Sequence, residues 1–232
     1  MVSSRKLTPH THGIMLKKPP GFSFRPTQFT FLSLQTDEGL DARPMSLATS
    51  PTRPNLEYGV RTGESPFKRA FASLEPGDRV NVQGPFGRFL LREDRPAVLV
   101  AGGIGITPLK GMAEYASDKS LPVPVRLLYS NRSEEEIAYR AELEELERRN
   151  PRFRVLQTLT GSGVPRGWKG SVGRIGAKHL GEVAEELEEP VYYVCGEPSM
   201  VGEMVGLLSD SGVPEGDVVV EVFRGYRTQL IP

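Results

Sequence analysis

Hydrophobic and polar positions divide the chain into two parts with different patterns. Through residue 94 the apolar runs are short, as in FTFLSL, LEYGV, RVNVQ and RFLL, and proline or glycine interrupts them at close intervals. Short runs between turn-forming residues are typical of antiparallel strands. We therefore predict that residues 1–94 form one domain, an antiparallel sheet or small β-barrel.

From residue 95 onward, strand-like and helix-like stretches alternate. The strand candidates are PAVLVAG, VPVRLLYS, RFRVLQTL, PVYYVCG and DVVVEVF. Helices are predicted between them, from about Pro108, across the acid-rich segment 133–150 with Glu134–Glu136 at its opening, near 176–188 and near 198–210. Such repeated units imply a parallel sheet with helices on both faces. Residues 95–232 are thus predicted to form an α/β doubly wound sheet, after a boundary near Glu93–Pro96.

Composition restricts the class of protein. The 232 residues suffice for two modest domains, and 29 basic side chains balance 29 acidic ones. This balance gives no bulk attraction to nucleic acid or anionic lipid. No apolar run approaches the roughly 18–20 residues that span a bilayer, and the N-terminus lacks the apolar core of a signal peptide. We expect a cytoplasmic protein with no nucleic-acid partner and no membrane span.

Metal-binding side chains are scarce. Cys195 is the only cysteine, which excludes an intrachain disulfide and an iron–sulfur cluster held by four cysteines of this chain. His10 and His12 are separated by one residue and have no third ligand nearby. Because zinc sites need three or four ligands, we predict no metal site.

A glycine-rich turn joins the first strand of the second part to its helix. The segment VLVAGGIGITPLKGM contains Gly102, Gly103 and Gly105. At such a turn, exposed backbone N–H groups and the helix dipole suit a pyrophosphate. Thr107 is the predicted N-cap and Pro108 the predicted first helical residue. Pro108 replaces the third glycine of the usual dinucleotide fingerprint, so a tight turn without a ligand is the alternative.

The next strand ends in Ser130, Asn131 and Arg132, without a carboxylate at its tip. NAD-binding turns usually place an acidic side chain there for the ribose 2′-hydroxyl. A hydroxyl, an amide and a guanidinium would instead tolerate or favour a 2′-phosphate at this position. This pattern slightly favours NADP over NAD, with Arg132 as a solvated surface charge the alternative.

The first part offers a second candidate anion site. RPMSLATSP places Arg43 and Ser46 on one predicted strand. Downstream, Gly63 precedes a predicted helix with Ser65 as N-cap and Pro66 in its first turn. A helix start facing a strand-borne arginine would bind a phosphate, although a surface arginine and a capped helix are also ordinary structure.

Four motifs occur in the order found in a known family. RPMS, GPFGRF, GGIGITP and CGEPSM follow one another between residues 43 and 200, with GWKGSVGRI between the last two and VEVF after them, and the resemblance that they carry extends over nearly the whole chain. In these motifs and their order, the chain resembles the ferredoxin–NADP reductase superfamily. The resemblance implies an antiparallel Greek-key β-barrel that binds flavin, followed by a doubly wound α/β domain that binds a nicotinamide nucleotide.

The resemblance also implies an activity. Hydride would pass between NADP or NAD and a flavin, FAD with FMN as the alternative, and single electrons would then reach a separate carrier. That carrier would be a ferredoxin- or flavodoxin-type protein or a partner subunit, because this chain lacks iron–sulfur cysteines. The alternatives are an NAD(P)H-dependent flavin or ferric reductase and a non-catalytic nucleotide-binding or regulatory subunit. A monomer and a dimer are equally compatible with the sequence.

Residue roles follow from the same resemblance. Arg43 would pair with the flavin phosphate, Gly63 and Ser65 would lie at the flavin phosphates, and the catalytic group would comprise Ser46, Cys195 and Glu221. Cys195 as a buried structural thiol and Glu221 as a plain strand-end carboxylate are the alternatives. The full set assigned to cofactor binding is Arg43, Pro44, Met45, Ser46, Tyr58, Val60, Gly63, Ser65, Gly102, Gly103, Gly105, Ile106, Thr107, Pro108, Ser130, Asn131, Arg132, Cys195, Gly196, Met200 and Phe223.

Three segments depart from the family pattern. PTQF at residues 26–29 replaces the commoner Pro-Gly-Gln-Phe, so the strand near Gln28 lacks a glycine. Met45 stands where the family has a tyrosine packed on the flavin ring, so we expect altered flavin affinity or potential, with loss of flavin as the alternative. Glu197 replaces the proline after Cys-Gly. We further expect the helix starts at Ser65 and Thr107 to face one cleft shared by the two domains.

Overall fold

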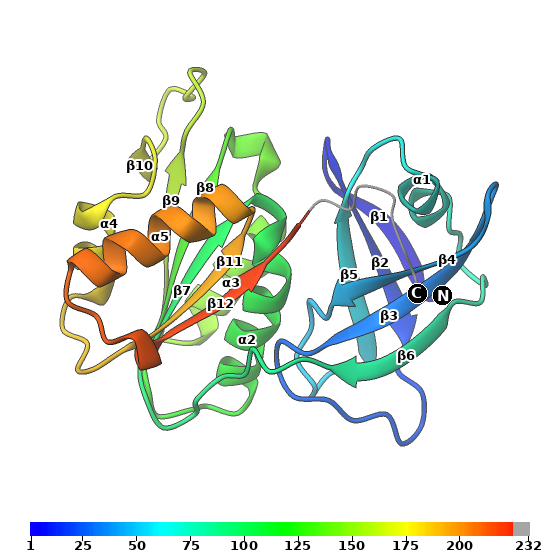
Figure 1. The fold of residues 1–232 in the computed structure, drawn as a ribbon, viewed down its shortest axis with the longest axis horizontal. Helices are drawn as coiled ribbons and strands as arrows, with labels where there is room; N and C mark the ends of the chain where they lie inside the picture. The colour runs from blue at the N-terminus through cyan, green and yellow to red at the C-terminus, as the bar shows by residue number, and fades with distance from the viewer. Residues whose placement is uncertain (225–232) are drawn as a thin grey trace.

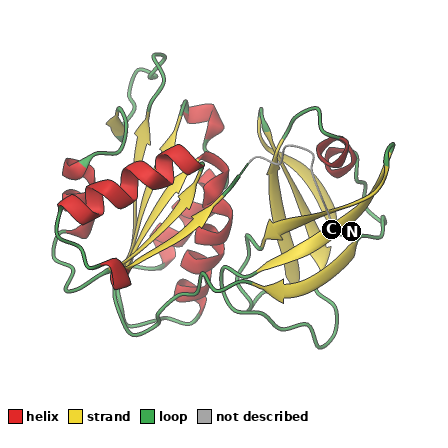
Figure 2. Ribbon diagram, in the orientation of Figure 1, coloured by secondary structure: helices red, strands yellow, loops and turns green. Residues whose placement is uncertain are grey.

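The structure is a computed structural model and describes residues 1–224 of the chain. Two domains lie side by side, a barrel built of strands and a sheet flanked by helices (Figure 1, Figure 2). In the described residues, no helix has the length and apolar character needed to cross a membrane.

The first domain is an antiparallel barrel of two three-stranded sheets. One sheet has the order β1-β2-β5 and the other the order β4-β3-β6. The chain crosses between the sheets after β2, after β4 and again after β5, as in a Greek key. The bounds are β1 Ser3–Thr8, β2 Thr11–Lys17, β3 Phe29–Thr36, β4 Gly39–Ser46, β5 Asn55–Arg61 and β6 Asn81–Phe86. Alternate residues of β3, such as Leu32 and Leu34, fill the interior, and this pattern confirms the predicted barrel.

A short helix, α1 (Pro66–Ala72), packs on the barrel. The hydroxyl of Ser65 accepts a hydrogen bond from the backbone N–H of Lys68 at 3.4 Å, and Pro66 is the first helical residue. Phe67 and Phe71 are buried against the barrel core. The predicted cap and helix are therefore confirmed.

The second domain is a six-stranded parallel sheet with the order β10-β9-β8-β7-β11-β12. Its strands are β7 Ala97–Gly102, β8 Val125–Asn131, β9 Phe153–Leu159, β10 Ser171–Val172, β11 Val191–Gly196 and β12 Val218–Val222. The helices are α2 Ile106–Asp118, α3 Arg140–Arg149, α4 Ala177–Ala184 and α5 Pro198–Asp210. Helices α2 and α3 cover one face and α4 and α5 the other (Figure 1).

Strand β7 shows why this sheet is covered on both faces. Leu99 packs with the core on the α2 and α3 side, whereas Val98 and Val100 pack with the core on the α4 and α5 side. Because successive strand residues point to opposite faces, a continuous apolar run predicts a strand buried on both sides. The predicted doubly wound domain is confirmed.

Two predicted helix starts are wrong. Helix α2 begins at Ile106 with Gly105 as its N-cap, because Gly103–Gly105 form a 3-10 turn that continues into the helix. Thr107 does not cap it, since its hydroxyl donates to the carbonyl of Ile104 at 3.1 Å. The acid-rich segment is also divided, into a 3-10 turn and a helix.

Glu134–Glu136 form a separate 3-10 turn and do not open α3. Tyr139, just before the helix, has a left-handed backbone with φ of +60°, which breaks any continuous helix at that point. The third predicted helix is likewise shorter, because α4 ends at Ala184.

One face of β5 meets the second domain. Glu57, Gly59 and Arg61 alternate along this strand, so their side-chain positions share that face. A methyl group at Gly59 would lie 2.6 Å from Oη of Tyr139 and 3.3 Å from the side chain of Thr107. The absence of a side chain at Gly59 therefore allows the barrel to approach the glycine turn.

Candidate functional site

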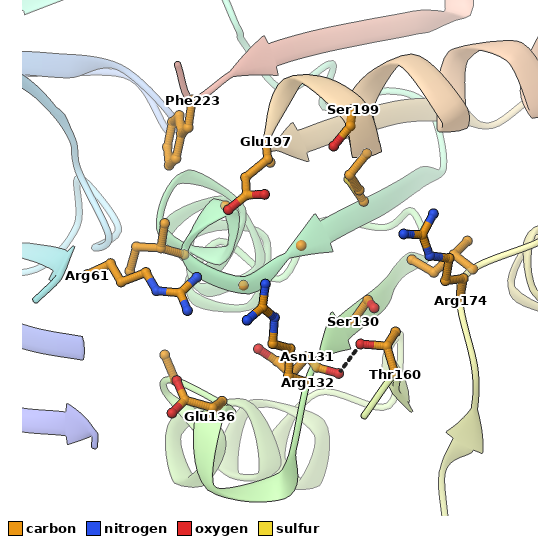
Figure 3. A pocket seen from close by; sticks show the side chains of 18 of the residues that line it. Arg61, Ser130, Asn131, Arg132, Glu136, Thr160, Arg174, Glu197, Ser199 and Phe223 are labelled. Atoms are coloured by element: carbon orange, nitrogen blue, oxygen red, sulfur yellow. Dashed lines mark hydrogen bonds between the residues drawn. The ribbon is translucent and has the colours of Figure 1, made fainter. Parts of the chain in front are cut away.

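A cleft of about 550 Å³ lies at the carboxyl ends of β7, β8 and β11. Open parallel sheets bind ligands at this edge. The barrel contributes His10, Thr11 and Arg61 to its wall, and the second domain contributes the remainder (Figure 3). The predicted residues that line it are Gly102, Gly103, Gly105, Ser130, Asn131, Arg132, Gly196, Met200 and Phe223.

The glycines of the turn are glycine for different reasons. A methyl group at Gly105 would lie 2.2 Å from the carbonyl oxygen of Cys195, so this position is fixed by packing of the turn against β11. Gly103 has φ of +51°, and a methyl group on it would meet no atom of the described chain within 4 Å. Of these two glycines, Gly103 therefore combines a backbone that needs glycine with free space for a ligand.

The end of β8 presents a buried donor that lacks an acceptor. Asn131 is 5% exposed, and its side-chain Nδ2 has no hydrogen-bond partner among residues 1–224. Its backbone carbonyl accepts from the Thr160 hydroxyl at 3.2 Å (Figure 3). Because a buried donor without an acceptor is costly, this amide is consistent with a polar ligand in the cleft.

Two guanidinium groups point into the cleft, one from each domain. Arg61 comes from the end of β5 and Arg132 from the loop after β8 (Figure 3). Within the described part of the chain neither forms an ion pair, whereas Arg174 pairs with Glu203 at 2.9 Å. Cations of this kind above the start of a helix favour a phosphorylated ligand.

Sequence reasoning missed Arg61. The alternation in LEYGVR places Arg61 on the same strand face as Gly59. That alternation alone does not reveal that the face meets another domain.

The predicted catalytic residues lie at the junction of the domains. Ser46 ends β4, and its hydroxyl donates to Oε1 of Glu221 on β12 at 3.0 Å. Burial raises the pKa of Glu221 to about 7, and the Ser46 hydrogen bond acts in the opposite direction. Cys195 pairs in register with Glu221 on the neighbouring strand.

The Cys195 thiol is enclosed. It is 0% exposed and does not line the cleft. Burial raises its pKa well above its usual value, and the nearby Glu221 carboxylate adds to this effect. These observations favour a buried structural thiol over a group that contacts a ligand.

The predicted flavin residues of the barrel lie outside this cleft. Arg43 is half-buried on β4 and pairs with Asp41 at 2.9 Å. Tyr58 is buried in the barrel core beside the Thr30 hydroxyl, 3.0 Å away, and burial raises its pKa. The side chain of Tyr58 therefore serves the core, and any cofactor contact there would come from its backbone. The other such residues are Pro44, Met45, Val60, Gly63 and Ser65.

The structure does not bring the two helix starts together in the cleft. Helix α1 lies on the part of the barrel remote from the second domain (Figure 1). Neither Ser65 nor Thr107 lines the cleft, and Ile106 and Pro108 are also buried in the start of α2. The expectation that both helix starts face one shared cleft is therefore wrong for this cleft, and the barrel residues that line it are His10, Thr11 and Arg61.

The histidine pair has separate contacts. Nε2 of His12 lies 2.6 Å from the Ser4 hydroxyl, and Nε2 of His10 lies 3.6 Å from Glu136. Across residues 1–224, no three or more His, Cys, Asp or Glu side chains are grouped to hold a metal ion.

The comparisons with known proteins agree with this geometry. A family model described as the oxidoreductase NAD-binding domain matches residues 99–205. Ferredoxin–NADP reductase B of Sorangium cellulosum is 31% identical over 234 residues, which cover 95% of each chain. This chain belongs to the ferredoxin–NADP reductase superfamily.

Members of the superfamily differ in length. NADH-cytochrome b5 reductase 2 of Mycosarcoma maydis is 30% identical over 202 residues, which are 77% of this chain and 57% of that protein. The chain thus spans about half the length of several curated relatives it matches. A ferredoxin NADP+ reductase from Neisseria gonorrhoeae, solved with FAD and NADP, shares the fold with a TM-score of 0.81 at 21% identity, over 95% of this chain and 96% of that one.

Proposed function

We propose that this chain is a flavin-dependent NAD(P)H oxidoreductase that passes electrons to a separate acceptor. The observation that carries this proposal is the cleft of a superfamily member, in which the open backbone at Gly103, the buried amide of Asn131 and the guanidinium groups of Arg61 and Arg132 converge. These groups match the phosphates and polar edges of a dinucleotide.

Within the cleft, the chain's own residues would bind and orient the nucleotide. The turn at Gly102–Gly105 would receive the pyrophosphate, because the N-terminal dipole of α2 favours an anion there. Arg61 would approach the phosphates from the barrel wall. Ser130 and Arg132 would bind the ribose end, and the lack of a carboxylate at this strand tip supports NADPH over NADH.

The barrel would hold the flavin, with FAD as the proposed form and FMN as the alternative. Arg43 on β4 and the exposed start of α1 at Gly63 and Ser65 are the proposed phosphate contacts. When bound, the flavin would accept a hydride from the nicotinamide and release electrons singly. The hydroxyl of Ser46, directed by Glu221, is the polar group that the barrel presents at the domain junction.

The electron acceptor would be a separate protein. The single cysteine of this chain offers no iron–sulfur relay. The matched relatives carry names of reductases of ferredoxin and of cytochrome b5. We propose a one-electron carrier of the ferredoxin or flavodoxin type, or a partner subunit.

Anaerobic titration of the purified protein tests the proposal. The protein is expected to carry a flavin absorption band that bleaches on addition of NADPH, more readily than on addition of NADH. A carrier panel of ferredoxin, flavodoxin, ferric citrate and free flavin then identifies the class of acceptor. A colourless protein that takes up neither FAD nor FMN would contradict an oxidoreductase and support a nucleotide-binding subunit.

A further inference from the structure

Charged residues form a chain of alternating sign across the boundary between the two domains. In order, its members are Glu142, Arg5, Glu57, Lys110, Glu114, Arg53, Asp118 and Arg149. Arg5, Arg53 and Glu57 belong to the barrel domain, and each of them pairs with a residue of α2 or α3. None of these eight residues lines the cleft.

The link between Lys110 and Glu57 is the most deeply buried of these pairs. Nζ of Lys110 lies 2.7 Å from Oε2 of Glu57, and the two side chains are only 4% and 7% exposed. The ammonium also lies 3.7 Å from Glu114 and 5.3 Å from the centre of the Tyr139 ring. Oε1 of Glu57 accepts from Arg5 at 3.0 Å. Both buried charges are thus compensated within the interface.

This link is close to the glycine turn in structure. Lys110 lies about one helical turn after Ile106, the first residue of α2, and the 3-10 turn of Gly103–Gly105 runs directly into that helix. Glu57 shares its face of β5 with Gly59 and Arg61. Because β5 and α2 are regular elements, fixing Lys110 to Glu57 also fixes the turn relative to the barrel.

A buried ion pair of this kind fixes the relative position of two elements more than it adds to the free energy of unfolding. Well-packed apolar residues often stabilise a buried interface as well as an ion pair does. Apolar surfaces tolerate small sliding movements, however, whereas separation of this pair would remove the shortest contact of the Lys110 ammonium and leave it with Glu114 alone at 3.7 Å, while Glu57 would keep only Arg5. Hydride transfer loses rate steeply when reacting atoms move by about 1 Å from a contact of about 3–3.5 Å.

We propose that Lys110 and Glu57 are positioning residues that set the separation between the nucleotide turn and the barrel for hydride transfer. This inference rests on the proposed function. It places no contact between either residue and a cofactor, so the pair is expected to affect the rate of flavin reduction far more than the binding of flavin or nucleotide.

The test compares Lys110→Met, Glu57→Gln and the double variant with the flavin-loaded wild-type protein. Flavin reduction by NADPH is followed anaerobically by stopped flow, and nucleotide affinity is measured by titration with NADP. In parallel, hydrogen–deuterium exchange reports on docking of β5 and of the turn at residues 102–105. A single variant leaves one partner charged in the interface and is at risk of not folding. The double variant removes both charges together, so the proposal can still be tested in a folded protein.

Arg149→Gln is the matched control, because Arg149 pairs with Asp118 at 2.8 Å, a contact between two residues of the second domain. We expect flavin reduction to slow at least tenfold in the Lys110 and double variants, with NADP affinity changed less than twofold and with faster exchange in β5 and the turn. The control is expected to match the wild type in all three measurements.

Wild-type reduction rates in a folded Lys110 or double variant would overturn the positioning role while leaving the proposed function intact. Failure of NADPH to reduce the flavin of the wild-type protein would overturn the proposed function itself, and the positioning role with it.

Discussion

The Ser46 hydroxyl donates a hydrogen bond to Oε1 of Glu221 at 3.0 Å, although 175 positions separate the two residues and each belongs to a different domain. Glu221 is partly buried, and burial raises the pKa of its carboxyl group from 4.5 to about 7. Between pH 4.5 and pH 7, the carboxyl group of Glu221 is therefore mostly protonated in the folded protein and mostly ionised in the unfolded chain.

This bond leads to a prediction about pH and stability. Since the folded state holds the extra proton, the contribution of Glu221 to the free energy of unfolding is greatest below pH 4.5 and falls until about pH 7. Relative to Glu221→Gln, the wild-type protein is expected to lose up to about 2 kcal/mol between pH 5 and pH 8. Urea unfolding of both proteins at the two pH values measures this difference. Parallel pH dependences would show that Glu221 titrates normally.

Alanine substitutions at Gly105 and Gly103 are predicted to affect different properties, stability at Gly105 and nucleotide affinity at Gly103. Gly105→Ala places a methyl group 2.2 Å from the carbonyl oxygen of Cys195 and 2.9 Å from Cα of Gly196, so the backbone of the turn or of β11 must shift. We expect a loss of about 3 kcal/mol or more in the free energy of unfolding. Thermal and urea unfolding provide the measurement.

Gly103→Ala meets free space, so its effect on folding is limited to the left-handed backbone, about 1 kcal/mol. Its methyl group would occupy the space where the pyrophosphate of the dinucleotide is proposed to bind. Titration with NADP is therefore expected to show at least a tenfold loss of affinity in a folded protein. Unchanged affinity would mean that the ligand does not approach this backbone.

The arginines of the cleft predict different effects on nucleotide choice. Arg132→Ala is expected to raise the KM for NADPH about tenfold, about 1.4 kcal/mol of charge-assisted binding, and to change the KM for NADH less than twofold. Arg61→Ala is expected to raise both values together, because Arg61 is proposed to contact the pyrophosphate. Steady-state assays with both nucleotides distinguish these patterns.

Arg79→Ala provides the control for net charge, because Arg79 is an exposed barrel residue outside the cleft. If Arg132→Ala raised the KM for NADPH and for NADH equally, Arg132 would not contact the 2′-phosphate.

The thiol of Cys195 is predicted to be inert in the native protein. It is 0% exposed, and its raised pKa keeps it protonated at neutral pH. A chromogenic disulfide reagent is expected to label it rapidly only after denaturation. Because the chain has no other cysteine, Cys195→Ala supplies the blank. Rapid labelling of the folded protein would indicate that the end of β11 opens to solvent.

Both domain folds could be predicted because their information is local. Alternating burial in β3 and the doubly buried run of β7 are visible in the sequence as period-two and continuous apolar patterns. The start of α2 could not be predicted as well. Thr107 and Pro108 favour a helix start, but the 3-10 turn at Gly103–Gly105 moves it upstream.

Contacts between distant segments account for what the sequence did not reveal. A lysine at position 110 of a buried helix face has no local explanation, and its partner Glu57 lies on another domain. The sequence predicts a ligand contact at Gly105, and this residue does line the cleft, but the contact that excludes a side chain there is with the carbonyl of Cys195. Arg61 enters the site only because β5 faces the second domain.

The mixed origin of the cleft wall has a consequence for protein engineering. Since Arg61, His10 and Thr11 line the cleft from the barrel, we expect the affinity for the nucleotide to depend on both domains. A chimera that grafts residues 95–224 onto a foreign barrel would inherit the Asn131 amide and the Gly103 turn, yet it would not inherit the opposing cation. Recombination at the domain boundary would therefore weaken the binding of NADPH and NADH alike, even when every residue of the grafted half is retained.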